Sequence, residues 1–143
     1  MPLAREEDHW VLPCEGLVVG QVRIDYAYGL EFTETPTGAA EISWRLRVET
    51  RFAFTDIVGA VHHLDPEGPA ETLAPALVAR HQQLIDGDVW ANGRIRMAFA
   101  NGSVLEVAPD DRYEAWTLAS DSVNGAPRLL VCTPGGEPVD WSR

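Results

Sequence analysis

The sequence predicts an α+β fold, mainly antiparallel sheet, made of two similar three-stranded meanders joined by one helix at about residues 72–86. Apolar residues alternate with polar ones over long stretches, Asn-Gly pairs punctuate the second half, and one segment has apolar residues at helical spacing. The 143 residues suit a single domain, 1–143. Within it we expect an irregular N-terminal arm at 1–16 and a loop-like tail at 133–143.

The first meander is predicted from apolar residues that recur at even positions from Val18 to Phe32. This alternation is long for one strand, so we expect a turn within residues 25–29. A loop at 35–38 separates it from a second alternating stretch at Ala40–Val48, which Phe52 and Phe54 extend to about Thr55.

The helix is predicted after a Gly- and Pro-containing loop at residues 56–70. Thr72 could cap the helix at its N-terminus, Pro75 falls in its first turn, and Gly87 suits its end. The apolar face at 3.6-residue spacing comprises Leu73, Leu77, His81, Leu84 and Ile85.

The second meander includes a hairpin between Arg94 and Val107, with its turn at Asn101-Gly102. A three-residue loop pairs Met97 with Leu105, whereas a two-residue loop would place Met97 opposite Glu106. Because a slip of one residue moves every side chain to the other face, we expect the three-residue loop, with Gly102 in a left-handed conformation. A return strand carrying Trp116 and a last strand at 128–132, after a turn at Asn124-Gly125, follow.

A weak internal repeat at an offset of 67 residues supports the idea of two similar meanders. The offset aligns Gly20 with Gly87 and Phe32 with Phe99. A duplication and a chance match of two strand patterns both remain open.

The net charge is −11, and all 11 basic residues are arginines. This acidity disfavours nucleic acid and anionic lipid as partners, and would attract a basic protein; alternatively, it only keeps the protein soluble. Absence of Lys beside abundant Ala and Gly is typical of a GC-rich genome. The sequence has no apolar run of membrane-spanning length and no secretory signal pattern at its start, so we expect a cytoplasmic protein.

Two groups of residues are candidate functional sites. The first is an acidic patch beside aromatic residues, Asp110, Asp111, Tyr113, Glu114 and Trp116, whose carboxylates could act in acid–base chemistry or bind Ca²⁺. Ordinary turn chemistry is the alternative interpretation of this patch.

The second candidate site is His62, His63 and Asp65, the most metal-like cluster of the sequence. Adjacent histidines on an extended chain point to opposite sides, which makes a shared metal ion awkward. Neither a zinc-finger spacing nor a phosphate-binding glycine loop is present, and Cys14 and Cys132 form no CxxC pair. We therefore expect no cofactor, no metal and no catalytic residue.

The segments VLEVAPDDRYEAWTL and VCTPGGEPVDW resemble those of a family of small uncharacterised actinobacterial proteins. The matching positions are Tyr113–Trp116, a YEAW-like segment, and Pro134–Glu137, a PGGE-like segment. The resemblance covers the C-terminal third to half of the chain and implies a domain of unknown function, without an established activity.

These observations favour a non-enzymatic acidic protein that works through a protein surface. An immunity-like role against a basic partner is one version, and pairing of two copies through a sheet edge is another form of interaction. The alternative is a small-molecule-binding protein or hydrolase, with a pocket between sheet and helix where His81 or His63 would meet carboxylates.

Overall fold

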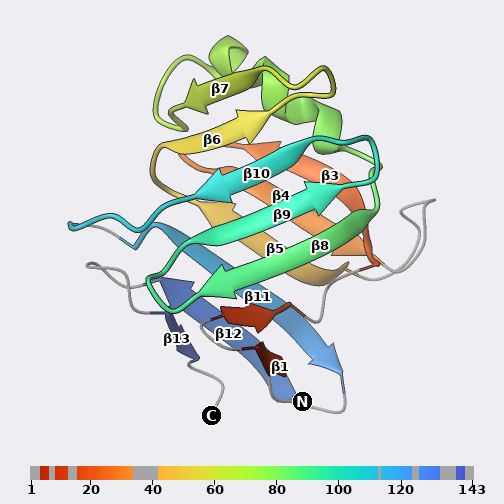
Figure 1. Cartoon of the computed structure of the whole chain (residues 1–143), viewed down its shortest axis with the longest axis vertical. Coiled ribbons are helices and arrows are strands. Elements are labelled where there is room, and N and C mark those ends of the chain that lie inside the picture. The colour runs from red at the N-terminus through yellow and green to blue at the C-terminus, as the bar shows by residue number, and fades with distance from the viewer. Residues whose placement is uncertain are drawn as a thin grey trace.

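The computed structural model (Figure 1) describes residues 4–6, 9–12, 16–33, 42–112, 114–123, 126–132 and 138–140. Within these ranges the chain forms two antiparallel sheets and one 3-10 helix, η1, at Ala70–Ala79. The mainly antiparallel fold with one helix that the sequence predicts is therefore confirmed at that level.

The first sheet has the strand order β1-β2-β8-β9-β10-β6-β7. Its strands are β1 (Ala4–Glu6), β2 (His9–Val11), β6 (Phe52–Thr55), β7 (Val61–Leu64), β8 (Leu84–Trp90), β9 (Ile95–Phe99) and β10 (Val104–Val107). The second sheet has the order β13-β12-β11-β5-β4-β3. Its strands are β3 (Val18–Ile24), β4 (Tyr28–Thr33), β5 (Ile42–Val48), β11 (Trp116–Val123), β12 (Ala126–Cys132) and β13 (Pro138–Asp140).

The two sheets lie face to face, with β3, β4 and β5 behind β6 and β8–β10 in Figure 1, and they enclose one hydrophobic core. The first sheet contributes Phe52, Phe54, Leu64, Leu84, Val89, Ile95, Met97, Phe99, Leu105 and Val107. The second contributes Val19, Tyr28, Leu30, Phe32, Trp44, Leu46, Val48, Trp116 and Leu118. Burial of these alternating side chains is the main source of stability, at about 25 cal/mol per Å² of apolar surface.

The predicted hairpin has the predicted register. Met97 lies opposite Leu105 and Ile95 opposite Val107. The Phe99 amide donates to the Ser103 carbonyl at 2.9 Å, which closes the three-residue loop, and Gly102 has φ +89°. The turn predicted within residues 25–29 is also confirmed, since it separates β3 from β4.

The predicted architecture of two three-stranded meanders is incomplete. Strands β3–β4–β5 and β8–β9–β10 are each consecutive and antiparallel, but each set belongs to a larger sheet. The return strand β11, which carries Trp116, pairs with β5 of the opposite sheet rather than with the hairpin. The chain also changes sheets between Val48 and Phe52, which the sequence analysis treats as one continuing pattern. Whether the repeat at an offset of 67 residues arose by duplication of one meander stays a hypothesis.

The predicted helix at 72–86 is wrong in type and in extent. Its buried residues Leu73, Ala76 and Ala79 are three apart, the spacing of a 3-10 helix, whereas Leu77 is 45% exposed. Leu84 and Ile85 belong to β8, and Gly87 lies inside that strand rather than at a helix end.

Pairing with β3 ends the helix early. The His81 amide donates to the Val19 carbonyl at 2.7 Å, and the Val19 amide donates to the Gln82 carbonyl at 2.9 Å. His81 has φ +65°, a left-handed conformation that a continuing helix excludes. These sheet-like hydrogen bonds lead the chain from η1 into β8, and they connect the edge of one sheet to the other.

The helix η1 contacts β3 and β7, and in Figure 1 it begins above β7 and runs behind β7 and β6, while the sheets cover one another. The Tyr28 hydroxyl donates to the Ala76 carbonyl at 2.8 Å and fastens η1 to the core.

Three regions predicted to be irregular contain strands. The arm at 1–16 includes β1 and β2, the loop at 56–70 includes β7, and the tail at 133–143 includes β13. Each is short and pairs at or near a sheet edge, where three or four residues give little visible alternation. The predicted turn at Asn124-Gly125 lies outside the described residues.

Candidate functional site

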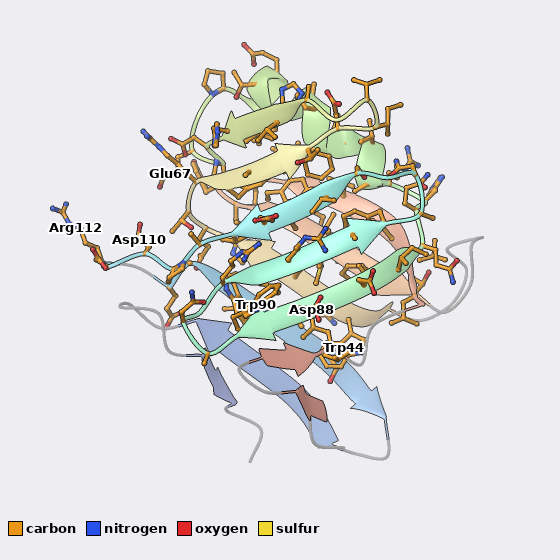
Figure 2. The ribbon with its side chains drawn as sticks, in the orientation of Figure 1. Trp44, Glu67, Asp88, Trp90, Asp110 and Arg112 are labelled. Atoms are coloured by element: carbon orange, nitrogen blue, oxygen red, sulfur yellow. The ribbon has the colours of Figure 1, made fainter. Side chains whose placement is uncertain are left out.

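The structure buries one member of the acidic patch. Trp116 is fully buried, and its Nε1 donates to the Gly93 carbonyl at 2.8 Å. Asp111 and Glu114 are exposed, and the Asp110 carboxylate accepts from the Arg112 amide at 2.8 Å in a loop that projects from the sheets (Figure 2). Tyr113 lies outside the described residues.

The histidine pair of β7 is divided between two environments. His62 is half-buried and its Nε2 lies 2.7 Å from Asp56 Oδ2, whereas His63 is exposed. Asp65 Oδ2 lies 3.5 Å from Nε of Arg51. Among the described residues, no three His, Cys, Asp or Glu side chains are grouped so that they could hold a metal ion.

Asp56 organises the turn between β6 and β7. Its Oδ1 accepts from the amides of Val58 and Ala60, each at 3.0 Å, and its Oδ2 contacts His62. The hydrogen bond from His62 is the main reason that the pKa of Asp56 is lowered from 3.8, and the backbone amides add to this effect. The turn therefore has a fixed shape, although its apolar side chains face solvent.

Five apolar side chains are exposed on this hairpin and on η1, which contacts β7. We call this surface the apolar end: Ile57, Val58, Val61, Leu77 and Val78. Val58 is 83% exposed and Ile57 59%. Asn101 donates through Nδ2 to the Val78 carbonyl at 3.0 Å, so the hairpin β9–β10 holds the last turn of η1.

The same part of the chain is acidic. Between Asp56 and Ala79 there are four carboxylates and no arginine. Two of them, Asp56 and Asp65, contact His62 and Arg51. Glu67 and Glu71 are exposed, and Glu67 lies at the periphery beside β7 (Figure 2). This segment therefore carries negative charge, with Asp56 in the β6–β7 turn and Glu67 beyond the other end of β7.

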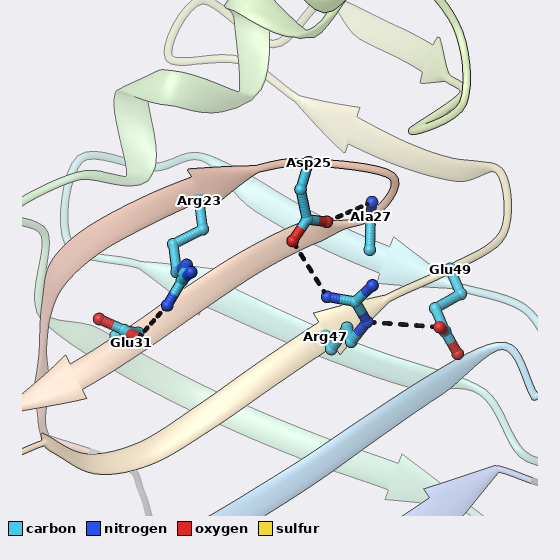
Figure 3. Close-up of polar contacts among 6 residues, drawn as sticks. All are labelled: Arg23, Asp25, Ala27, Glu31, Arg47 and Glu49. Carbon is cyan, nitrogen blue, oxygen red and sulfur yellow. Dashed lines mark hydrogen bonds and ion pairs between the residues drawn. The ribbon is translucent and has the colours of Figure 1, made fainter.

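A second surface feature is a depression of about 220 Å³ on the outer face of β3, β4 and β5. It is lined by Arg23, Asp25, Gly29, Leu30, Glu31, Arg45, Leu46 and Arg47. Figure 3 shows its ion pairs. Arg23 Nη1 lies 3.4 Å from Glu31 Oε1, and Arg47 contacts Asp25 and Glu49, each at 3.3 Å.

Hydrogen bonds shift the ionisation of two groups in this depression. The Ala27 amide, followed by Arg47, lowers the pKa of Asp25. Desolvation opposes the charged form of Arg47, but the hydrogen bonds that Arg47 donates to Glu49 and Asp25 raise its pKa overall. The alternation at Ala40–Val48 does not reveal this site, because the approach of Arg23 to Arg47 depends on a cross-strand register that no local pattern specifies.

The outer face of the first sheet carries a matching set of contacts. The Arg94 guanidinium lies 4.5 Å from the ring centroid of Trp90, and Arg94 Nη2 lies 2.9 Å from Glu106 Oε2. Arg96 Nε is 3.6 Å from Glu106 Oε1. These cross-strand pairs cover the sheet with polar groups.

The protein thus has a two-sheet antiparallel fold. Its described surface includes the apolar end, in an acidic segment of the chain, and a depression lined by arginines. Residues 10–142 match the Family of unknown function (DUF6188), and the chain belongs to that family. Membership of a family of unknown function was expected, and the match extends well beyond the C-terminal half. No curated protein and no solved structure matches the chain. In the part of the chain that the structure describes, no helix is long and apolar enough to cross a membrane.

Proposed function

We propose that the protein is a non-enzymatic interaction protein that binds a basic protein partner through its apolar end. The observation that carries this proposal is the exposure of Ile57, Val58 and Val61 on a turn whose backbone is fixed by Asp56. A preordered apolar surface loses little conformational entropy on binding, which favours affinity.

The charge of this end supports a basic partner. Protein interfaces commonly have an apolar centre and a polar rim, and complementary charge at the rim raises the association rate. Here the segment from Asp56 to Ala79 carries four carboxylates and no arginine, in a chain of net charge −11. A partner with arginines or lysines around an apolar centre would match both features.

An immunity-like role, in which the protein blocks a basic toxin, is one concrete form of this function. Cytoplasmic location and an actinobacterial source belong to the same proposal. The support for this source is the arginine-only basic composition, which is typical of a GC-rich genome. A second copy of this chain, paired through an edge strand such as β7, would occupy the same surface in place of a foreign partner.

The alternative, a small-molecule site between sheet and helix, has less support. Leu73, Ala76 and Ala79 are buried where η1 meets the sheets. His63 and His81 are exposed, and neither has a described hydrogen bond to a carboxylate. We therefore favour the surface interaction.

The test is affinity capture from the source cell with three bait proteins: wild type, Val58→Asp and Ile85→Ser. Ile85 is 45% exposed on β8 and is separated from β7 by three strands, so it is a matched apolar control. We expect wild type and Ile85→Ser to capture the same basic protein, and Val58→Asp to lose it. Retention should weaken when salt is raised from about 50 to about 200 mM, because the attraction between the acidic segment and a basic partner is screened.

Equal capture by Val58→Asp would contradict the proposed surface, and capture of no specific protein would contradict an interaction role. Size measurement of the purified bait separates self-association from a foreign partner. If wild type is a dimer and Val58→Asp is a monomer, the partner at this surface is a second copy of the chain and not a basic protein.

A further inference from the structure

We propose that the depression on the outer face of β3, β4 and β5 binds a small oxyanion, a carboxylate or a phosphate group, between Arg23 and Arg47. This site does not depend on the apolar end or on the function proposed for it. The inference rests on register, on the glycine at its centre and on the unused donors of the two arginines.

The register places the two arginines on either side of one residue. Gly29 of β4 lies opposite Arg23 of β3 and opposite Arg47 of β5. Neighbouring strands are about 4.8 Å apart, so the two arginine backbones border a strip roughly 10 Å wide. Because Gly29 has no side chain, the centre of this strip is open down to the backbone.

The fold does not require glycine at position 29. Its φ is not positive, unlike that of Gly102. A Cβ would lie 3.5 Å from Arg23 Cβ and 3.5 Å from the Leu46 carbonyl oxygen, which are ordinary contacts. Glycine weakens the interior of a strand, and it often marks a place where a ligand approaches the backbone.

Both arginines retain hydrogen-bonding capacity. A guanidinium carries several N–H donors in a planar fork that suits carboxylate and phosphate. Within the described residues, Arg23 makes one contact, at 3.4 Å, and its side chain is 61% exposed. Arg47 makes two contacts through Nε and Nη1, which leaves Nη2 available, and its side chain is 47% exposed.

Charge and volume limit the ligand. The depression and its border hold three arginines, Arg23, Arg45 and Arg47, and three carboxylates, Asp25, Glu31 and Glu49, so it is locally neutral in a chain of net charge −11. The volume of about 220 Å³ is below the roughly 300 Å³ at which drug-sized ligand sites begin. A small carboxylate, an inorganic phosphate or one acidic group of a larger molecule fits these limits.

The experiment is a titration of ¹⁵N-labelled protein with succinate and, separately, with inorganic phosphate, at constant ionic strength adjusted with sodium chloride. We expect saturable shifts of backbone amides in β3, β4 and β5 for at least one of the two anions. Saturation by only one assigns the ligand to the carboxylates or to the phosphates.

Three variants make the result specific. Arg23→Gln should weaken binding about tenfold or more, the loss expected for a charged hydrogen bond. Gly29→Ala should weaken it by covering the floor while the protein stays folded. Arg94→Gln, on the other sheet, is the matched control and should leave the affinity unchanged.

Shifts that do not saturate, or that chloride reproduces, would overturn the proposal. Equal weakening by Arg94→Gln would also overturn it, since the effect would then reflect net charge. Arg23 is chosen ahead of Arg47 because Arg47 also holds Asp25 and Glu49, so its loss could disturb the fold.

Discussion

The Trp116 indole Nε1 donates a hydrogen bond of 2.8 Å to the backbone carbonyl of Gly93. Trp116 begins β11 in one sheet, and Gly93 lies in the turn between β8 and β9 of the other. Both residues are buried. This bond therefore connects the two sheets, and it gives a structural role to a tryptophan that the sequence places in an acidic functional patch.

Replacement of Trp116 should reveal this connection. Trp116→Phe removes the donor, leaves the Gly93 carbonyl unsatisfied and opens a cavity, so we expect a loss of roughly 2 to 4 kcal/mol in the free energy of unfolding. Urea denaturation measures it. Trp90→Phe, on the half-buried outer face, is the control and should cost less than about 1 kcal/mol, because the new ring can still stack on Arg94. Equal losses in the two variants would contradict a special role for Trp116.

The hairpin turn makes a second prediction. Gly102 has φ +89°, which a β-branched residue resists, so Gly102→Val should destabilise the protein by about 1 to 3 kcal/mol. Space is not the reason, since no atom lies within 4 Å of the position of a Cβ. Ala100→Val, in the same loop but without a positive φ, should change stability little. If the Gly102→Val protein melts at the wild-type temperature, the turn is assigned wrongly.

The three-residue spacing of buried side chains along η1 can be tested with two substitutions at neighbouring positions. Ala76 is fully buried and accepts a hydrogen bond from Tyr28, whereas Leu77 is 45% exposed. Ala76→Leu should therefore destabilise the protein by about 1 to 3 kcal/mol through overpacking, and Leu77→Ala should cost less than about 1 kcal/mol. Thermal melting of both variants is sufficient. A larger loss of stability for Leu77→Ala than for Ala76→Leu would contradict the 3-10 spacing and would favour an α-helix with Leu77 buried.

The Asp56 turn should make stability depend on acid pH. Because its pKa is lowered from 3.8 in the folded state, Asp56 contributes stability above that pH, and the contribution is lost as pH falls through the lower, folded value. We expect wild type to melt above Asp56→Asn at about pH 6, with the difference closing by about pH 2. Asp86→Asn, at an exposed position in β8, is the control. A difference that does not change with pH would exclude this contribution.

Local patterns predicted the parts of the fold that depend on local chemistry. Alternation and the left-handed requirement of Gly102 specify the β9–β10 hairpin, including the pairing of Met97 with Leu105. The turn at Asp25 follows from strand length in the same way. These features need no knowledge of what lies on the other side of the core.

The remainder depends on contacts between distant residues. The segment from His81 to Leu84 has helical spacing, yet its backbone bonds to Leu17 and Val19, and this tertiary pairing overrides the local preference. Similarly, Val48 and Phe52 keep the same parity although they lie in different sheets, because both point into the shared core. The arginine depression was missed for the same reason, since Arg23 and Arg47 meet only through β4.

The most direct test of the proposed function is hydrogen exchange of the protein with and without its captured partner. Binding at the apolar end predicts slower exchange of backbone amides in residues 56–79, covering the β6–β7 turn, β7 and η1. The amides of β3–β5 should exchange as they do in the free protein. Protection over β3–β5 with no change in residues 56–79 would contradict the account.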